Sequence, residues 1–289
     1  MRHHYVPQFL LRSWAESTPD GKIEVFRFDL DKLISSRRTP RNTGYENDLY
    51  ALSKPIVAGM EQHAVEKHFL RHVDNVAARV RTKLEKSGLR TLTDEDRVHW
   101  TQFLMSLRIR QPEVVQMLRD DAERRFRATL AAEPEQYEEL AEPEGPPNLE
   151  EWTNKHFPGL IENIGLSFFK KLVDNPEIGN KILRMKWWVW DFSAVSHDLL
   201  VADHPCIFTC GIDDPNLVIA LPISPKKAFM TTCSDRVAEI MRRQDARHLA
   251  ARLNESSVAQ ARVRICARDR SSERFIRKRM LLRKARVGP

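Results

Sequence analysis

The chain has 289 residues, 42% of them hydrophobic, with 6 tryptophans and 13 phenylalanines, a composition too apolar for an intrinsically disordered protein. Its net charge of +7 arises at the C-terminus, because nine basic and two acidic residues lie between Arg268 and Arg286 and the remaining residues balance. The longest apolar runs, such as Leu217 to Ile223, are far shorter than the roughly 20 residues of a membrane-spanning helix, and no apolar leader follows Met1, so we expect a cytoplasmic protein with reduced cysteines.

The first half of the chain is predicted to hold one strand followed by three helices. Residues 23–30 alternate apolar and polar side chains after a Pro-Asp-Gly turn, which is typical of a strand. Apolar residues then recur at helical spacing over residues 65–84. Thr93 and Asp96 resemble a capping box that opens a second helix. Pro112 predicts a break before a third helix that ends near residue 130.

The second half is predicted to contain strands followed by helices. Residues 133–151 hold eight glutamates, four prolines and no lysine or arginine, which indicates an exposed acidic loop. A helical stretch at 161–173 precedes short apolar runs that predict strands, at residues 186–192, 199–202, 217–221 and 228–232. From about residue 235 to the end the pattern is helical.

These elements predict an α+β fold, with long helices packed on a segregated, mostly antiparallel sheet and a helical C-terminus. We expect a single domain over residues 1–267, with the acidic loop as an insertion. Residues 268–289 would form a basic C-terminal helix or tail.

The opening sequence, from His3 to Arg12, is the most informative stretch. It reads His-His-Tyr-Val-Pro-Gln-Phe-Leu-Leu-Arg and is too apolar to remain in water, so it should pack against the strands near Asp203. In an extended segment His3 and His4 would point to opposite faces. A neutral imidazole can act as a base or a metal ligand. The alternative is that both histidines bond to backbone groups and only hold the terminus in place.

This opening resembles that of the domain-of-unknown-function family 4238. Two further segments resemble motifs of the same family: Asp203-His204-Pro205, and the Pro-Ile-Ser-Pro sequence that begins at Pro222. Ala202 and His204 depart from it, since that family often has Ser and Asn there. The resemblance covers most of the chain and implies a shared fold without implying a reaction.

From these motifs we expect a functional site, with catalytic residues His3, His4, Gln8 and Asp203. Asp203 follows an apolar run, which would place it at the end of a strand, where carboxylates often face a cleft. The alternative is that Asp203 accepts backbone N–H bonds in a turn.

The opening is also similar to the His-His-(Ile/Val)-Val-Pro stretch of His-Asn-His-type toxin nucleases. That similarity implies a histidine base that activates water beside a divalent metal. Only Met1 and Arg2 precede the histidine pair, so any shared chemistry would need a frame other than a ββα metal finger.

Acidic residues near the first predicted helix are candidates for the metal. Glu61, together with Asp203, could supply carboxylates to Mg²⁺ or Mn²⁺, and Glu66 offers a third oxygen ligand. His68 and His72, at i and i+4, suit a metal in principle, but Phe69 excludes the His-Glu-x-x-His motif of zinc proteases.

Arginine and lysine residues supply candidate contacts to nucleic acid. Arg108 and Arg110 end the second helix, where each could reach a phosphate or pair with a buried carboxylate. In the tail, the basic candidates are Arg274, Arg277, Lys278 and Arg279. The tail could instead pair with the acidic loop.

The sequence therefore predicts a hydrolase that acts on RNA or DNA, a metal-dependent nuclease in a bacterial toxin or defence setting. The alternative is a non-catalytic nucleic-acid-binding or regulatory protein in which the histidines are structural. A third possibility, an interaction module, rests on the family resemblance alone.

Overall fold

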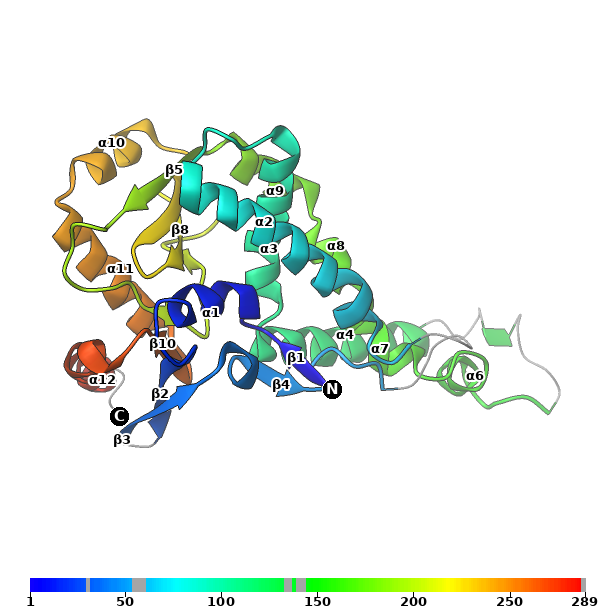
Figure 1. The fold of residues 1–289 in the computed structure, drawn as a ribbon. Helices are drawn as coiled ribbons and strands as arrows, with labels where there is room; N and C mark the ends of the chain where they lie inside the picture. The colour runs from blue at the N-terminus through cyan, green and yellow to red at the C-terminus, as the bar shows by residue number, and fades with distance from the viewer. Residues whose placement is uncertain (30–31, 54–60, 133–136, 139–143, 287–289) are drawn as a thin grey trace.

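The computed structural model describes residues 1–29, 32–53, 61–132, 137–138 and 144–286. Within them, two four-stranded antiparallel sheets and one two-stranded ribbon form the framework (Figure 1). The strand orders are β3-β2-β10-β6, β5-β9-β8-β7 and β1-β4. The strands are β1 (Arg2–His4), β2 (Ile23–Asp29), β3 (Lys32–Arg38), β4 (Tyr45–Asn47), β5 (Lys186–Asp191), β6 (Val201–Ala202), β7 (Ile207–Phe208), β8 (Val218–Ser224), β9 (Lys227–Thr232) and β10 (Arg264–Ala267).

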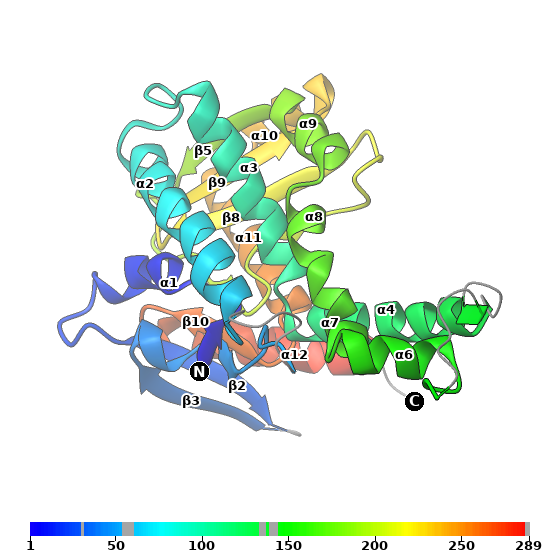
Figure 2. The ribbon, with the colours of Figure 1, turned by 90° about the vertical axis from the view of Figure 1, so that its right-hand side faces the viewer.

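Helices surround the sheets and extend to one side of them (Figure 2). The helices are α1 (Gln8–Ala15), η1 (Pro40–Asn42), η2 (Val65–Leu70), α2 (Arg71–Ser87), α3 (Asp94–Ile109), α4 (Pro112–Ala132), α6 (Leu149–His156), α7 (Leu160–Ser167), α8 (Phe169–Val173), α9 (Pro176–Arg184), α10 (Asp235–Arg243), α11 (Ala246–Gln260), η3 (Arg270–Ser272) and α12 (Glu273–Arg286). The predicted α+β class is confirmed. No helix among the described residues has the length and apolarity needed to cross a membrane.

The β5-β9-β8-β7 sheet is buried on both faces. Trp187 and Phe229 belong to the core cluster shared with α1, α2 and α3, whereas Trp188 and Met230 pack with α10 and α11 on the other face. This split follows from the alternation of side chains along a strand. The strand predicted at residues 186–192 is confirmed as β5, and the burial of Trp187 and Trp188 makes both rings core residues.

The β3-β2-β10-β6 sheet joins the two ends of the chain. β10 lies between β2 and β6, and Ile265 and Phe26 on one face of the sheet pack with residues of α11 and α12. The prediction of unbroken helix after residue 235 is wrong at β10, whose four residues are too few for a clear alternating pattern. The strands are therefore less segregated along the sequence than expected.

Local sequence signals explain several helix ends. The Thr93 hydroxyl accepts the Asp96 N–H at 3.1 Å, and the Asp96 carboxylate accepts the Thr93 N–H at 2.9 Å, which confirms the capping box. The predicted break at Pro112 is confirmed, because α3 ends at Ile109 and α4 begins at Pro112.

Residues 133–136 and 139–143 of the predicted acidic loop fall outside the described residues. In its final part, Asn148 caps the N-terminus of α6, and Glu150 in the first turn of that helix pairs with Arg127 of α4. In Figure 1, α6 and the C-terminal α12 lie at opposite ends of the molecule. The described part of the acidic segment therefore does not pair with the basic tail.

Candidate functional site

The two histidines of the opening motif are separated by the pleat of β1. β1 pairs with β4 so that His4 lies opposite Tyr45. His3 points into the protein and is fully buried, whereas His4 lines a cleft. This opposite orientation is the one expected for neighbours in a strand.

His3 is held by the backbone of Tyr50. The Tyr50 N–H donates to Nδ1 of His3 at 2.8 Å, and the two rings stack with centroids 5.4 Å apart. Because Nδ1 accepts this bond, the neutral ring carries its proton on Nε2. Burial, with a smaller effect from His63, lowers the pKa of His3 from 6.5 to about 4. His3 is therefore neutral at pH 7, and its one lone pair is already used, so it serves as a structural residue and not as a base.

We expect acid to destabilise the protein through His3. Since the pKa of the ring is 6.5 when unfolded and about 4 when folded, the stability that it contributes is complete above pH 6.5 and is lost as pH falls toward 4. The loss should not exceed about 3 kcal/mol, at about 1.4 kcal/mol per pKa unit. Urea unfolding of the wild type and of His3→Asn at pH 7 and pH 4.5 measures it. Asn offers an oxygen near the position of Nδ1 and has no titration, so an equal acid loss in both proteins would contradict this role for His3.

A group of possible metal ligands surrounds His3. Atoms of His3, Asp48 and His63 lie within 4.8 Å of one another, and Asp48 has a backbone φ of 57°, a left-handed conformation that is uncommon outside glycine. Nε2 of His3 would have to face the ion, yet the Tyr50 bond keeps the proton on this nitrogen. The carboxylate of Asp48 already accepts a bond from the Met1 ammonium group. Nε2 of His3 and Nδ1 of His63 are buried without a hydrogen-bond partner among the described residues, so the group is not fully bonded, but the proton that the Tyr50 bond keeps on Nε2 of His3 opposes metal binding there.

His4 has the tautomer required of a general base. Nε2 lies 3.3 Å from the carbonyl oxygen of Arg41, which can only accept, so Nε2 carries the proton. The lone pair is then on Nδ1, which lies 3.4 Å from the side-chain amide nitrogen of Gln8. The structure thus brings His4 and Gln8 together, as predicted. Burial lowers the pKa of His4, an effect that the Arg41 carbonyl opposes, and this keeps the ring neutral and able to take a proton.

Glu66 lies beside His4 and forms the second titratable group of the cleft. It accepts the backbone N–H of His4, and its Oε2 is buried without a partner among the described residues. Burial raises the pKa of Glu66 to about 7, which nearby Arg110 opposes and Asp74 reinforces. Sequence reasoning named Glu66 only as a possible magnesium ligand. Its proximity to His4 could not be inferred, because the helix that carries it is brought to β1 by tertiary packing.

The cleft around His4, Gln8 and Glu66 has a volume of about 700 Å³ and a basic lining. Arginine side chains from four different places in the sequence line it: Arg2, Arg12, Arg41 and Arg71. The carboxylates on the wall are Glu66 and Asp74, and Asp74 is paired with the buried Arg110 at 2.9 Å. The cleft thus combines a carboxyl group that can donate a proton, Glu66, with the neutral imidazole of His4 and with guanidinium groups. Such a set suits the hydrolysis of an anionic ester.

Asp203 has a structural role in this arrangement. Its two carboxylate oxygens accept the backbone N–H groups of Arg262, Val263 and Arg264 at 2.6–2.9 Å, just before and at the start of β10. This is the backbone-bonding alternative weighed from the sequence. The described contacts join Asp203 neither to His4 nor to Glu61, and a single site containing both His4 and Asp203 stays a prediction. Asp203 lies close to the opening motif nevertheless, since Arg264 also donates to the hydroxyl of Tyr5.

The other candidates near the first helices also differ from expectation. Glu61 is half-exposed and pairs with Lys67 at 2.8 Å and with His68 at 3.6 Å. Arg110 is fully buried in its pair with Asp74, so it is not available to nucleic acid. This corrects its assignment as a phosphate contact, because a fully buried guanidinium needs its carboxylate partner. Arg108 is exposed and lies over the ring of Phe208.

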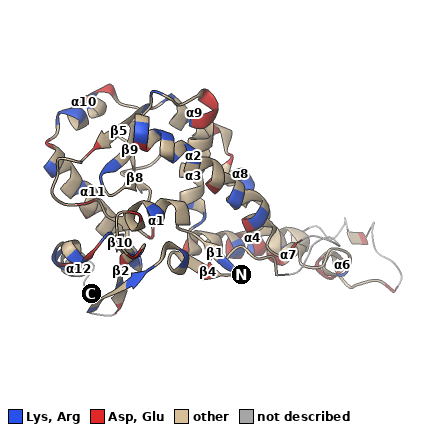
Figure 3. Cartoon of the chain, viewed as in Figure 1, with Lys and Arg blue, Asp and Glu red and all other residues tan. Residues whose placement is uncertain are grey.

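The basic tail forms α12, which packs on α11 through the buried Ile276. Arg277 pairs with Glu273, and Arg279 pairs with Glu255 of α11. Arg274 and Lys278 are exposed, and Figure 3 shows the basic residues of α12 at one edge of the molecule. The residues after the boundary predicted at residue 268 therefore do not form a separate tail, because α12 packs against the part of the chain before it.

Comparison with known proteins agrees with the sequence motifs. Neither a curated protein nor a solved structure matches the chain. The model of one family, described as "Protein of unknown function (DUF4238)", matches residues 2–271 and so spans the opening motif, Asp203 and all strands of the two sheets. With this match over nearly its whole length, the chain belongs to the DUF4238 family.

Proposed function

We propose that this protein is a hydrolase that cleaves the phosphodiester backbone of RNA or DNA in the His4 cleft. The observation that carries the proposal is that His4 and Glu66 line the same cleft with four arginines, where the Glu66 carboxylate accepts the backbone N–H of His4. Their environments move the two pKa values in opposite directions, His4 downward and Glu66 upward. Such a pair holds a base and an acid ready at the same pH.

The proposed reaction assigns one proton transfer to each group. Nδ1 of His4 takes a proton from water as the water oxygen attacks phosphorus. Glu66, protonated below about pH 7, gives its proton to the oxygen that leaves when the P–O bond breaks. The arginines of the cleft bind the phosphate oxygens and stabilise the charge that develops on them. The Gln8 amide lies 3.4 Å from Nδ1 in this structure and must release that nitrogen before His4 can take the proton.

The proposal is tested by incubating the purified protein with end-labelled RNA and DNA in the presence of Mg²⁺, Mn²⁺ or EDTA. Cleavage that persists in EDTA supports the acid–base assignment. Cleavage that requires the metal would give Glu66 and Asp74 a different role, as oxygen ligands of the kind that Mg²⁺ prefers. If neither nucleic acid is cleaved under any of these conditions, the proposal fails.

A non-catalytic nucleic-acid-binding protein is the second candidate. The bonds of His3 and Asp203 to backbone groups favour it, since two of the four predicted catalytic residues stabilise the fold. In this case the exposed basic residues of α12 would supply the binding energy.

This second function predicts binding that is strongly salt-dependent and centred on α12. Because Arg277 and Arg279 are paired with glutamates, the variant to test is Arg274→Gln with Lys278→Gln, which leaves both ion pairs intact. We expect the slope of log affinity against log salt to fall by roughly one for each phosphate that the helix no longer neutralises. Fluorescence anisotropy at several salt concentrations measures it. An affinity that is insensitive to salt, or equal in the double variant, would exclude α12 as the binding element.

A further inference from the structure

We propose that a second cavity, on the open face of the β3-β2-β10-β6 sheet, binds the phosphate group of a nucleotide. The cavity has a volume of about 310 Å³ and lies outside the His4 cleft. Its floor comes from side chains that alternate along the strands, Val25 and Arg27 of β2, Ser36 and Arg38 of β3, and Arg264 of β10. The opposite face of the same sheet packs on α11 and α12, and on this face Val25 is buried against the core that includes α1, whereas Arg27 and Arg38 are exposed.

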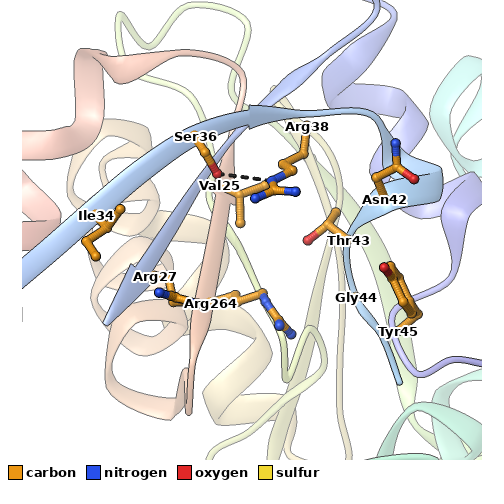
Figure 4. A pocket seen from close by; sticks show the side chains of 10 residues that line it. All are labelled: Val25, Arg27, Ile34, Ser36, Arg38, Asn42, Thr43, Gly44, Tyr45 and Arg264. Carbon is orange, nitrogen blue, oxygen red and sulfur yellow. Dashed lines mark hydrogen bonds between the residues drawn. The ribbon is translucent and has the colours of Figure 1, made fainter. Parts of the chain in front are cut away.

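The cavity carries positive charge that its own walls do not neutralise. Arg27, Arg38 and Arg264 line it, and no aspartate or glutamate does. Arg38 donates to the Ser36 hydroxyl at 3.3 Å, and Arg27 reaches an acidic group only at the cavity's outside, the half-exposed Asp29 at 3.3 Å. Figure 4 shows the side chains of Arg38, Arg264 and Thr43 around the same space. Guanidinium groups converging in a hollow without a carboxylate attract an anion.

Arg264 is fixed in place by two residues that are distant from it and from each other in the sequence. It donates to the Tyr5 hydroxyl, and its backbone N–H donates to the Asp203 carboxylate at 2.9 Å. Tyr5 belongs to the opening motif and Asp203 to the second motif, 198 positions later in the sequence. Two of the three segments that resemble the family thus meet at one arginine of this cavity, which accounts for Asp203 without giving it a catalytic role.

The opposite wall of the cavity is also built by the opening motif. The Val6 N–H donates to the Gly44 carbonyl at 3.0 Å. Gly44 has a φ of 64°, and a Cβ added there would lie 2.8 Å from the Cβ of Val6. Only glycine allows the segment to approach Val6 this closely. The contact positions Thr43 and Tyr45 at the cavity.

The lining suits a nucleotide phosphate. Guanidinium groups bind phosphate oxygens bidentately, and the hydroxyl groups of Ser36 and Thr43 add neutral donors. Tyr45 also lines the cavity, but Arg2 lies over its ring, so the phosphate and not a base is the group that this lining recognises. We therefore assign to the cavity a nucleotide unit, held by its phosphate, either within a strand or as a free mononucleotide.

The cavity is next to the proposed catalytic cleft. Arg2, which lines the cleft, donates to Asn42 of the cavity at 2.7 Å and lies over the Tyr45 ring, 4.6 Å from its centre. A strand cleaved in the His4 cleft could place a neighbouring phosphate among Arg27, Arg38 and Arg264. This last placement rests on the proposed hydrolase function, whereas the phosphate pocket itself does not.

Binding measurements on full-length single variants test the pocket. The probes are a short fluorescein-labelled single-stranded oligonucleotide, followed by anisotropy, and adenosine monophosphate, followed by calorimetry. We expect Arg38→Gln and Arg264→Gln to weaken binding about tenfold or more, because each removes charge-assisted bonds to phosphate. Arg236→Gln is the matched control, since Arg236 is also exposed but lies on α10, away from this sheet. A loss with the oligonucleotide alone assigns the pocket to a strand, and a loss with adenosine monophosphate assigns it to free nucleotides.

Several results would overturn the pocket. The first is that the wild-type protein binds neither probe. The second is that the pocket variants bind both probes as tightly as the wild type. The third is that Arg236→Gln loses as much probe binding as the pocket variants. Arg27→Gln and Arg38→Gln keep the test decisive if Arg264→Gln unfolds, since Arg27 and Arg38 are exposed. Glu66→Gln separates this pocket from the proposed function, because it should abolish cleavage and retain oligonucleotide binding.

Discussion

Replacing Asp203 with alanine is expected to lower the free energy of unfolding by about 3–5 kcal/mol, as for other buried hydrogen-bond networks. The carboxylate of Asp203 is nearly fully buried and accepts three backbone N–H groups, from residues 262, 263 and 264. Hydrogen bonds to a charged group contribute about 1.5–3 kcal/mol each, and the N–H groups left behind would lack acceptors. Asp203→Asn should cost less, because one oxygen remains to accept.

Urea unfolding followed by circular dichroism measures this loss, and a decrease in Tm of roughly 10 °C should accompany it. Asp213→Ala is the matched control. Its carboxylate is exposed and pairs only with Lys181 among the described contacts, so a change within about 0.5 kcal/mol is expected. If Asp203→Ala were as stable as the wild type but inactive as a nuclease, the result would contradict the structural role and support the catalytic role predicted from the sequence.

Removing the titrating groups of the cleft is expected to lower cleavage by about 10²–10⁴-fold for each residue, the usual contribution of a general acid or base. The variants are His4→Ala and Glu66→Gln. Because both protons move in one reaction step, the double variant should lose much less than the product of the two single effects. Rates are normalised to the folded fraction, since His4 is mostly buried.

The pH profile distinguishes catalysis from a structural effect. With Glu66 as the acid, the rate should fall as pH rises through about 7, where the carboxyl loses its proton. With His4 as the base, the rate should fall on the acidic side, below the usual pKa of histidine. Exposed residues of the same types provide controls, His248→Ala on α11 and Glu239→Gln on α10. Wild-type rates in both cleft variants would refute the assignment.

The same shift of Glu66 has a consequence for stability. A carboxyl group with a raised folded pKa stabilises the fold fully below its unfolded value of 4.5, and this contribution is lost as pH rises through about 7. Glu66→Gln, which resembles the protonated form, should therefore be more stable than the wild type above pH 7. Since Glu66 is partly exposed, the expected gain is only about 1–2 kcal/mol. Loss of activity together with a gain in stability would not be expected on replacing a residue whose role is structural.

The sequence alone determined those features that depend on neighbours along the chain. The capping box at Thr93, the break at Pro112, the strand at residues 23–29 and the opposite orientations of His3 and His4 all follow from local geometry. The motifs beginning at His3 and containing Asp203 were enough to identify the family. The α+β class followed from the same periodic patterns.

Only the tertiary structure decided which polar groups are available for chemistry. His3, Asp203 and Arg110 have the residue types of an active site, but Nδ1 of His3, the carboxylate of Asp203 and the guanidinium of Arg110 are already bonded, to Tyr50, to the backbone of residues 262–264 and to Asp74. The place of Glu66 beside His4 and the arginine pocket could not be found from the sequence, because their residues come from separate strands and helices that meet only on folding. A side chain's pKa and partners depend on burial and on atoms distant in the sequence, and the spacing of residues along the chain carries no record of either.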